Sequence, residues 1–110
     1  MKPTEVQIKK FWEWCGFAIS GTRYYLPGIT LRYIVGQPEI DLNNLFKYAV
    51  PKLGLNDRIK IGWSPVAGEM LYTVEIIIWS QIGLNEHLMW TDKDPALALF
   101  WAIYKVMEAK

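Results

Sequence analysis

The sequence of 110 residues contains one cysteine, Cys15, and one histidine, His87. A single cysteine cannot form a disulfide within the chain, and the two residues fall short of the four ligands that a structural zinc ion needs. The glycines are dispersed and never form a phosphate-cradling motif. We therefore expect no disulfide framework, no bound metal and no cofactor.

The sequence also lacks an excess of charge and a long hydrophobic run. Lysine and arginine total 12 against 11 acidic residues, so the net charge of +1 gives no broad field that would attract nucleic acid or an anionic membrane. No segment reaches the roughly 18 apolar residues of a membrane span, and the N-terminus has no secretory pattern. These absences argue against nucleic-acid and membrane partners and indicate a cytoplasmic protein.

Apolar residues are plentiful. Hydrophobic residues make up 52% of the chain and aromatic residues 15%, which is typical of a folded protein rather than a disordered one. A chain of this length can bury a core without disulfides or a structural metal. We expect a single domain over residues 1–110.

Two helices are predicted in the first half of the chain. Residues 4–14 begin with a capping-box pattern at Thr4. Residues 41–53 begin at Asp41 and repeat apolar side chains at helical spacing. Because Pro51 lacks an N–H and its ring crowds the preceding turn, the second helix should bend or end just before it.

The third predicted helix is the C-terminal segment, which starts at Asp94 and Pro95 as a capping residue and a favoured first residue. From residue 96 to residue 104 no side chain is charged, so the apolar surface is wider than a single stripe. Such a helix lies deep against a sheet or offers part of its surface to another chain. A homodimer through this helix is one expectation that follows.

Three strands are predicted between the second and third helices. Residues 59–63 alternate as in a half-exposed strand, residues 70–79 have large apolar groups on both faces, and residues 86–91 form a short third strand. A turn over residues 64–69 and other short links favour an antiparallel meander. Residues 17–37 read as mostly irregular, and within them residues 29–35 are predicted to form a short strand, a candidate fourth strand, or an extended arm.

Three segments together resemble the phage ABA sandwich family, small proteins of phages, prophages and bacterial open reading frames. They are residues 12–17 (Trp-Glu-Trp-Cys-Gly-Phe), residues 41–53 with Pro38 before them, and residues 92–103. The most distinctive parts are Leu-Phe-Lys-Tyr-Ala-Val-Pro-Lys-Leu at residues 45–53 and Asp-Pro-Ala-Leu-Ala-Leu at residues 94–99. The resemblance implies an α+β protein with a layered α/β/α sandwich, a small antiparallel sheet and three helices. It also implies a bacterial or phage-infected host cell, and it supplies no catalytic residues.

The search for catalytic chemistry gives only weak candidates. Asp92 and Asp94 are better explained as helix-capping residues than as a metal pair. Glu75 is a carboxylate inside an apolar strand, which is consistent with a general acid or base or with an ion pair to a nearby basic residue. We favour the ion pair, with Arg32, Arg58 or Lys60 as its partner. A small hydrolase or transferase that uses Glu75, Asp92 or His87 is kept as an alternative function.

The aromatic residues are a better functional signal. Six tryptophans and six tyrosines are many for a domain of this size, and aromatic and arginine side chains dominate binding hot spots. The candidates that lie near predicted loops are Arg23, Tyr24, Tyr25, Trp79 and Trp90. We predict a non-enzymatic accessory protein that binds a protein or a small ligand; a self-associating structural unit is the other alternative.

Overall fold

The computed structural model describes residues 1–25, 33–54, 57–79 and 85–109. Within these ranges the fold is α+β, as predicted, with three α-helices and with two antiparallel sheets where one was predicted. The chain divides into an N-terminal unit of residues 2–39 and a C-terminal unit of Met1 with residues 40–110. Each unit is described by itself, and the single domain over the whole chain stays a prediction.

The N-terminal unit begins with the helix α1, Glu5–Trp14. The Thr4 hydroxyl accepts a hydrogen bond from the Gln7 N–H at 3.2 Å, and the Gln7 side chain accepts one from the Thr4 N–H at 2.9 Å. This reciprocal pair confirms the predicted capping box. Gly16 follows the helix with a φ of 107°, a left-handed conformation that favours glycine and ends the helix.

A small sheet follows, and it was not predicted as such. Its strands are β1 Ala18–Ser20, β2 Arg23–Tyr25 and β3 Tyr33–Val35, in the order β1-β2-β3. The prediction of irregular structure is therefore wrong for β1 and β2, whereas β3 lies within the short strand predicted at residues 29–35. Residues 26–32 lie outside the described part of the chain. Strands of three residues are too short for an alternating pattern to be recognised in the sequence.

Aromatic rings form the core of the N-terminal unit. The ring centroids of Phe11 and Trp12 are 5.1 Å apart, those of Trp12 and Phe17 5.5 Å, and those of Phe17 and Tyr24 6.1 Å. Each of these pairs has an edge-to-face arrangement, which suits the electrostatics of aromatic rings. Many of the aromatic residues near the N-terminus thus fill a core.

The C-terminal unit begins with one helical segment, residues 42–52, whose hydrogen-bond pattern changes twice. Asp41 caps it by accepting a hydrogen bond from the Asn44 N–H at 2.7 Å. The α-helical turn α2, Leu42–Asn44, continues into a π-helical turn, η1, Leu45–Ala49, and a 3-10 turn, η2, Val50–Lys52. Pro51 lies in the last turn, where its missing N–H accounts for the predicted end of regular helix.

The second sheet belongs to the same unit and has the predicted antiparallel meander. Its strands are β4 Arg58–Val66, β5 Glu69–Trp79 and β6 Asn85–Asp92, with β5 in the centre. Ala67 and Gly68 connect β4 to β5 with φ values of 51° and 81°, which are typical of a two-residue type I′ turn. The predicted turn over residues 64–69 was too long, because β4 continues to Val66.

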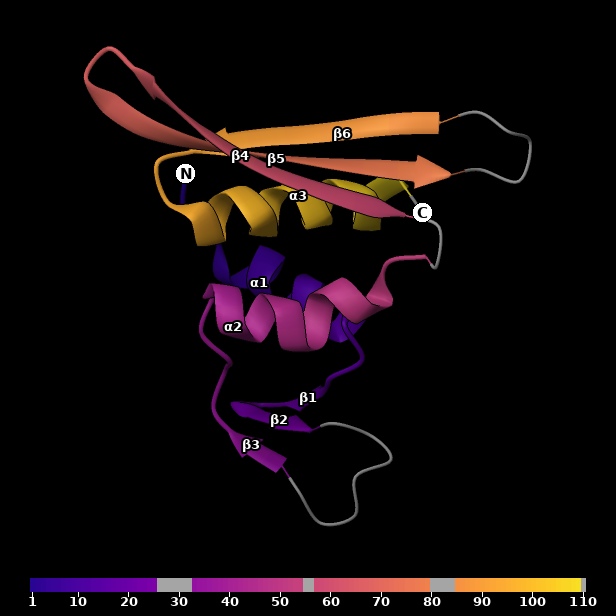
Figure 1. The fold of residues 1–110 in the computed structure, drawn as a ribbon. Helices are drawn as coiled ribbons and strands as arrows, with labels where there is room; N and C mark the ends of the chain where they lie inside the picture. The colour runs from indigo at the N-terminus through magenta and orange to yellow at the C-terminus, as the bar shows by residue number, and fades with distance from the viewer. Residues whose placement is uncertain (26–32, 55–56, 80–84, 110) are drawn as a thin grey trace. The chain divides into compact units, whose positions relative to one another are not determined.

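The C-terminal helix α3, Pro95–Ala109, packs along one face of this sheet (Figure 1). Leu99, Phe100 and Ile103 are fully buried, and α3 also contacts the helical segment of residues 42–52. This arrangement confirms that α3 lies deep against a sheet. A sandwich with helices on both sides of the sheet stays a prediction. No helix in the described ranges is long and apolar enough to cross a membrane.

Candidate functional site

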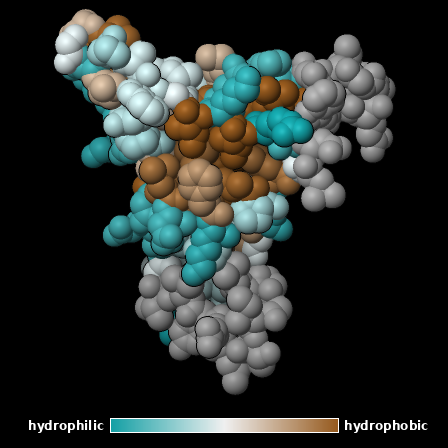
Figure 2. All heavy atoms as spheres, in the orientation of Figure 1, coloured by the Kyte–Doolittle hydropathy of each residue, from teal (hydrophilic) through white to brown (hydrophobic). Residues whose placement is uncertain are grey.

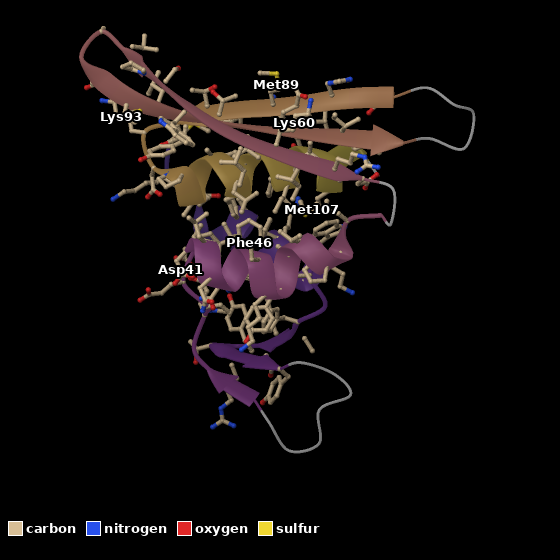
Figure 3. All side chains as sticks on the ribbon, in the orientation of Figure 1. Asp41, Phe46, Lys60, Met89, Lys93 and Met107 are labelled. Carbon is tan, nitrogen blue, oxygen red and sulfur yellow. The ribbon has the colours of Figure 1, made fainter. Side chains whose placement is uncertain are left out.

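The strand register divides the side chains of the C-terminal sheet between two faces. Residues opposite each other in neighbouring strands share a face, so Ile61, Val74 and Trp90 lie on one side. Val74 is fully buried there, beneath α3. By the same register Lys60 and Met89 lie on the outer face, and Figure 3 shows both on the side of the sheet away from α3.

The large apolar side chains of the C-terminal unit that are exposed on the side of the sheet that carries α3 include Met70 on β5 and four from two other elements. Leu42 and Phe46 come from the helical segment, and Ile61 and Trp63 come from β4. Their exposed fractions lie between 37% and 69%. Figure 2 shows hydrophobic side chains gathered at the centre of the face in view, and Figure 3 labels Phe46 there. We call these four residues the apolar surface.

The exposure of Trp63 follows from unequal strand lengths, whereas Ile61 lies on the edge strand within the three-stranded part of the sheet. Pairing between β5 and β6 ends at Tyr72 and Asp92, whereas β4 and β5 continue to Val66 and Glu69. Figure 1 shows the β4–β5 turn extending beyond β6 and α3. Trp63 lies opposite Tyr72, at the point where β6 ends, and it is 69% exposed.

β4 is also an edge strand, because among the described residues no strand pairs with its other side. Residues that flank a two-residue turn form a hydrogen-bonded pair, and here these residues are Val66 and Glu69. From this pair onward, hydrogen-bonded and non-hydrogen-bonded residue pairs alternate along β4 and β5. The backbone groups of Ile61 and Trp63 therefore point to the free edge. The backbone groups of Pro65 also point to the free edge, so its missing N–H removes no hydrogen bond to β5.

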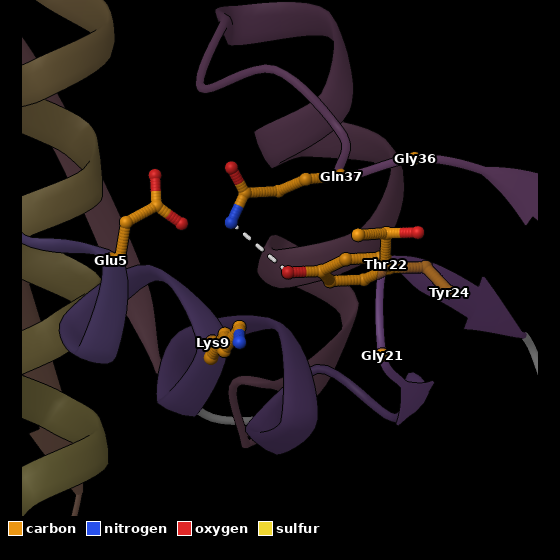
Figure 4. A pocket seen from close by; sticks show the side chains of 7 residues that line it. All are labelled: Glu5, Lys9, Gly21, Thr22, Tyr24, Gly36 and Gln37. Carbon is orange, nitrogen blue, oxygen red and sulfur yellow. Dashed lines mark hydrogen bonds between the residues drawn. The ribbon is translucent and has the colours of Figure 1, made fainter.

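The N-terminal unit contains a surface pocket of about 240 Å³. The residues that line it are Glu5, Lys9, Gly21, Thr22, Tyr24, Gly36 and Gln37. The Gln37 Nε2 group donates a hydrogen bond to the Tyr24 hydroxyl at 3.0 Å, and Figure 4 shows this pair beside the pocket. The pocket therefore combines an ammonium, a carboxylate and neutral polar groups.

The predicted cluster of Arg23, Tyr24 and Tyr25 is divided by strand geometry. All three residues form β2, in which successive side chains point to opposite faces. Tyr24 is only 2% exposed and packs against Phe17, whereas Arg23 is exposed and Tyr25 is half-buried. Tyr24 lines the pocket, and its ring also packs in the core against Phe17.

Trp90 packs within the C-terminal unit. Its ring centroid lies 5.5 Å from that of Trp101, and the Lys105 ammonium lies 5.0 Å from the Trp90 centroid. The half-buried indole is held by α3 and does not project from a loop. The side chain of Trp79 lies outside the described part of the structure.

Glu75 and His87 meet on the outer face of the sheet. The Glu75 Oε1 and His87 Nδ1 atoms are 3.4 Å apart, and the histidine side chain is about half exposed. When His87 is protonated, this contact is an ion pair of Glu75. Its partner is not one of the three basic residues predicted from the sequence. Arg32, one of those three, lies outside the described residues.

Asp92 is held by groups of the same unit. Its carboxylate accepts a hydrogen bond from the Met1 ammonium at 2.7 Å and one from the Asp94 N–H at 3.0 Å. Burial raises the pKa of Asp92, but these hydrogen bonds and the nearby positive charge outweigh burial and leave the pKa below its ordinary value. Asp94 in turn accepts a hydrogen bond from the Ala96 N–H at 2.8 Å, which is the predicted helix-capping role.

In the described ranges, no three potential metal-ligating side chains come together. No protein-family model, curated protein or solved structure matches the chain. The resemblance to the phage ABA sandwich family therefore stays a prediction, and only the geometry of this chain supports a function.

Sequence reasoning did not select any residue of the apolar surface. Ile61 and Trp63 were correctly placed in a half-exposed strand, but alternation does not indicate which alternate residues a helix covers. Leu42 and Phe46 matched the apolar pattern of an amphipathic helix, and that pattern does not indicate which apolar residues stay exposed.

Proposed function

We propose that the protein works by binding another protein through the apolar surface formed by Leu42, Phe46, Ile61 and Trp63. The observation that carries this proposal is the exposure of four large apolar side chains from two elements of one unit. Scattered single apolar residues are normal on a protein surface, but a group of them beside a packed core is typical of an interaction site.

The chemistry of the surface agrees with protein binding. Trp63 and Phe46 are large aromatic groups of the kind that anchor interfaces. Ile61 adds a β-branched aliphatic side chain with little rotational freedom. The free edge of β4 adds main-chain donors and acceptors to this apolar area. An extended segment of a partner can satisfy both parts, because it adds a strand and presents alternate side chains.

The biological setting of this proposal comes from the resemblance to the phage ABA sandwich family. It favours a non-enzymatic accessory protein of phage or prophage origin that acts in the host cytoplasm. The binding surface itself is argued from exposure and strand geometry, so it does not depend on that setting.

Capture of partners by a tagged chain tests the proposal. Phe46→Ser and Trp63→Ser should each reduce the partner captured from a bacterial host lysate by about tenfold, the effect of losing a moderate hot spot. Met89→Ser is the matched control, because Met89 is an exposed apolar residue on the outer face of the same sheet. Equal capture by all three variants and the unmodified chain would contradict the proposal.

A small ligand in the pocket beside Tyr24 is the second candidate. The observation in its favour is the hydroxyl of a buried tyrosine, already aligned by Gln37 at 3.0 Å, next to Thr22 and Lys9. Tyr24→Phe keeps the ring and removes the hydroxyl. In an NMR screen of polar fragments, the unmodified chain should show chemical-shift changes at the pocket residues, and these changes should be smaller in Tyr24→Phe. A screen that gives no shift changes at the pocket residues would reject the candidate.

The alternative of a hydrolase or transferase has less support. Glu75, Asp92 and His87 are absent from the residues that line the pocket. Asp92 is occupied by the Met1 ammonium and the Asp94 N–H. The contact between Glu75 and His87 is the remaining argument for it, and that contact lies on an open sheet face.

A further inference from the structure

We propose that the partner at the β4 part of the apolar surface is β4 of a second copy of this chain, paired antiparallel about Ile61. This inference rests on the proposed function, since it names the occupant of the same surface. It joins two three-stranded sheets edge to edge into one continuous sheet. The reasons are the backbone pattern, the side-chain pattern and the charges of residues 58–64.

Three alternate residues of β4 have main-chain hydrogen-bonding groups that point to the free edge. Ile59, Ile61 and Trp63 direct their N–H and C=O groups to the free edge, as the pairing with β5 requires. Antiparallel pairing about Ile61 places Ile61 opposite Ile61 of the second copy and Ile59 opposite Trp63. Each of these pairs can exchange two main-chain hydrogen bonds. Pro65 lies beyond this stretch, so its missing N–H interrupts none of those bonds.

The side chains of β4 are self-complementary in this register. On the face that carries α3, Ile59 lies beside Trp63 of the second copy and Ile61 beside its own equivalent. Aromatic and β-branched residues are favourable cross-strand neighbours. Pairing thereby covers Ile61 and Trp63, which are 43% and 69% exposed in the single chain.

The charges on the outer face select this register. Pairing about Ile61 places Lys60 opposite Gly62 and Arg58 opposite Ser64, so no like charges face each other. An added Cβ at Gly62 would meet no atom within 4 Å, which indicates open space for the lysine stem. Pairing about Lys60 would place two ammonium groups directly opposite each other, which is destabilising.

Pairing about Gly62 is the other neighbouring register. It avoids like charges, but it places Ile59 opposite Pro65, which cannot donate a main-chain hydrogen bond. The register about Ile61 is therefore the one of the three in which Ile59, Ile61 and Trp63 all pair without proline and no like charges face each other.

The mass of the complete chain in solution tests the proposal. Sedimentation velocity over a dilution series should give twice the mass of one chain at high concentration. Ile61→Lys introduces like charges at the symmetry axis and should raise the dissociation constant at least about tenfold. Trp63→Lys, at an even more exposed position, should act in the same direction. Met89→Lys is the control, since Met89 is 48% exposed on β6 and should leave the dimer intact.

A cysteine scan tests the register. Ile61→Cys should form a disulfide-linked dimer under mild oxidation, because opposite residues in a hydrogen-bonded pair have Cα atoms about 5.5 Å apart. Lys60→Cys should not, since it faces Gly62. The unmodified chain is the control, because its one cysteine, Cys15, is buried.

The outcomes separate this inference from the proposed function. A single-chain mass for the unmodified protein at every concentration overturns self-pairing, and loss of lysate capture in Trp63→Ser then still upholds protein binding. A dimer that survives Ile61→Lys and Trp63→Lys overturns pairing through β4 and favours the dimer through α3 predicted from the sequence. Cross-linking of Lys60→Cys but not Ile61→Cys overturns the register.

Discussion

Tyr24 shows how neighbouring residues of one motif take different roles. Arg23, Tyr24 and Tyr25 stand together in the sequence, yet the strand places the middle ring in a core with Phe17 and leaves the arginine exposed. A replacement of all three residues therefore mixes two effects. Single variants separate stability from binding.

We predict that Tyr24→Ala lowers the free energy of unfolding by about 3–5 kcal/mol, the range for removing a large buried aromatic side chain. Arg23→Ala should change it by less than about 0.5 kcal/mol, because the side chain is exposed. Urea unfolding of both variants measures the difference. Similar small losses in both would place Tyr24 outside the core.

Asp92 supports a prediction about pH. Its pKa is lowered in the folded chain, so its stabilising effect is present above the ordinary value of 3.8 and is lost as the pH falls through the lower folded value. Asp92→Asn should therefore reduce stability at neutral pH by about 1–3 kcal/mol, as for hydrogen bonds to a charged group. The difference from the unmodified chain should shrink as the solution is acidified below that value.

The control for this experiment is Glu69→Gln. Glu69 forms an exposed ion pair with Lys93 at 2.9 Å, and such pairs contribute at most about 1 kcal/mol. Urea unfolding at several pH values compares the two variants. An Asp92→Asn effect as small as that of Glu69→Gln, or one that grows on acidification, would contradict the assigned role.

At the scale of elements, α3 is the helix on which the C-terminal unit is packed. Its side chains cover the α3-facing side of the sheet, and the Trp101 Nε1 group donates a hydrogen bond to the Met1 carbonyl oxygen at 2.8 Å. Phe100 and Trp101 are both buried, and their centroids are 5.0 Å apart.

We predict that Phe100→Ala and Trp101→Ala each lower the free energy of unfolding by about 3–5 kcal/mol, because each leaves a large cavity beneath the sheet. Glu108→Ala, at an exposed position of the same helix, should cost less than about 0.5 kcal/mol. Chemical denaturation measures all three. Losses below about 1 kcal/mol for both aromatic variants would show that neither side chain lies in the core.

The elements differ in how far the sequence predicts them. Thr4, Asp41 and Asp94 have side chains that cap helices locally, so the helix starts are readable without tertiary information. The long strand β5 alternates over enough residues to be recognised. The strands β1 and β2 are too short for that, and their pairing depends on a turn at Gly21 and Thr22 that carries little signal.

The candidate site was less predictable, because exposure depends on which elements end first. Trp63 and Trp90 both lie in alternating strands and share a sheet face, and only the structure shows that α3 packs on Trp90 while Trp63 is left exposed. Lone aromatic residues near loops were a natural choice, but proximity to a loop does not determine whether a packed helix covers the ring.

At the scale of the molecule, the two units offer different kinds of contact. The described part of the N-terminal unit has a small polar pocket, and the C-terminal unit has the apolar surface and the free edge of β4. Pairing of β4 with β4 of a second copy is the central claim, since it unites the exposed apolar side chains with unused main-chain groups.

Amide hydrogen exchange along β4, measured by NMR over a dilution series, tests this claim most directly. The N–H groups of Lys60 and Gly62 are bonded to β5 in the single chain and should exchange slowly at every concentration. Those of Ile61 and Trp63 should be protected at high protein concentration and should exchange rapidly on dilution or after Ile61→Lys. Rapid exchange at Ile61 and Trp63 at every concentration would contradict the account.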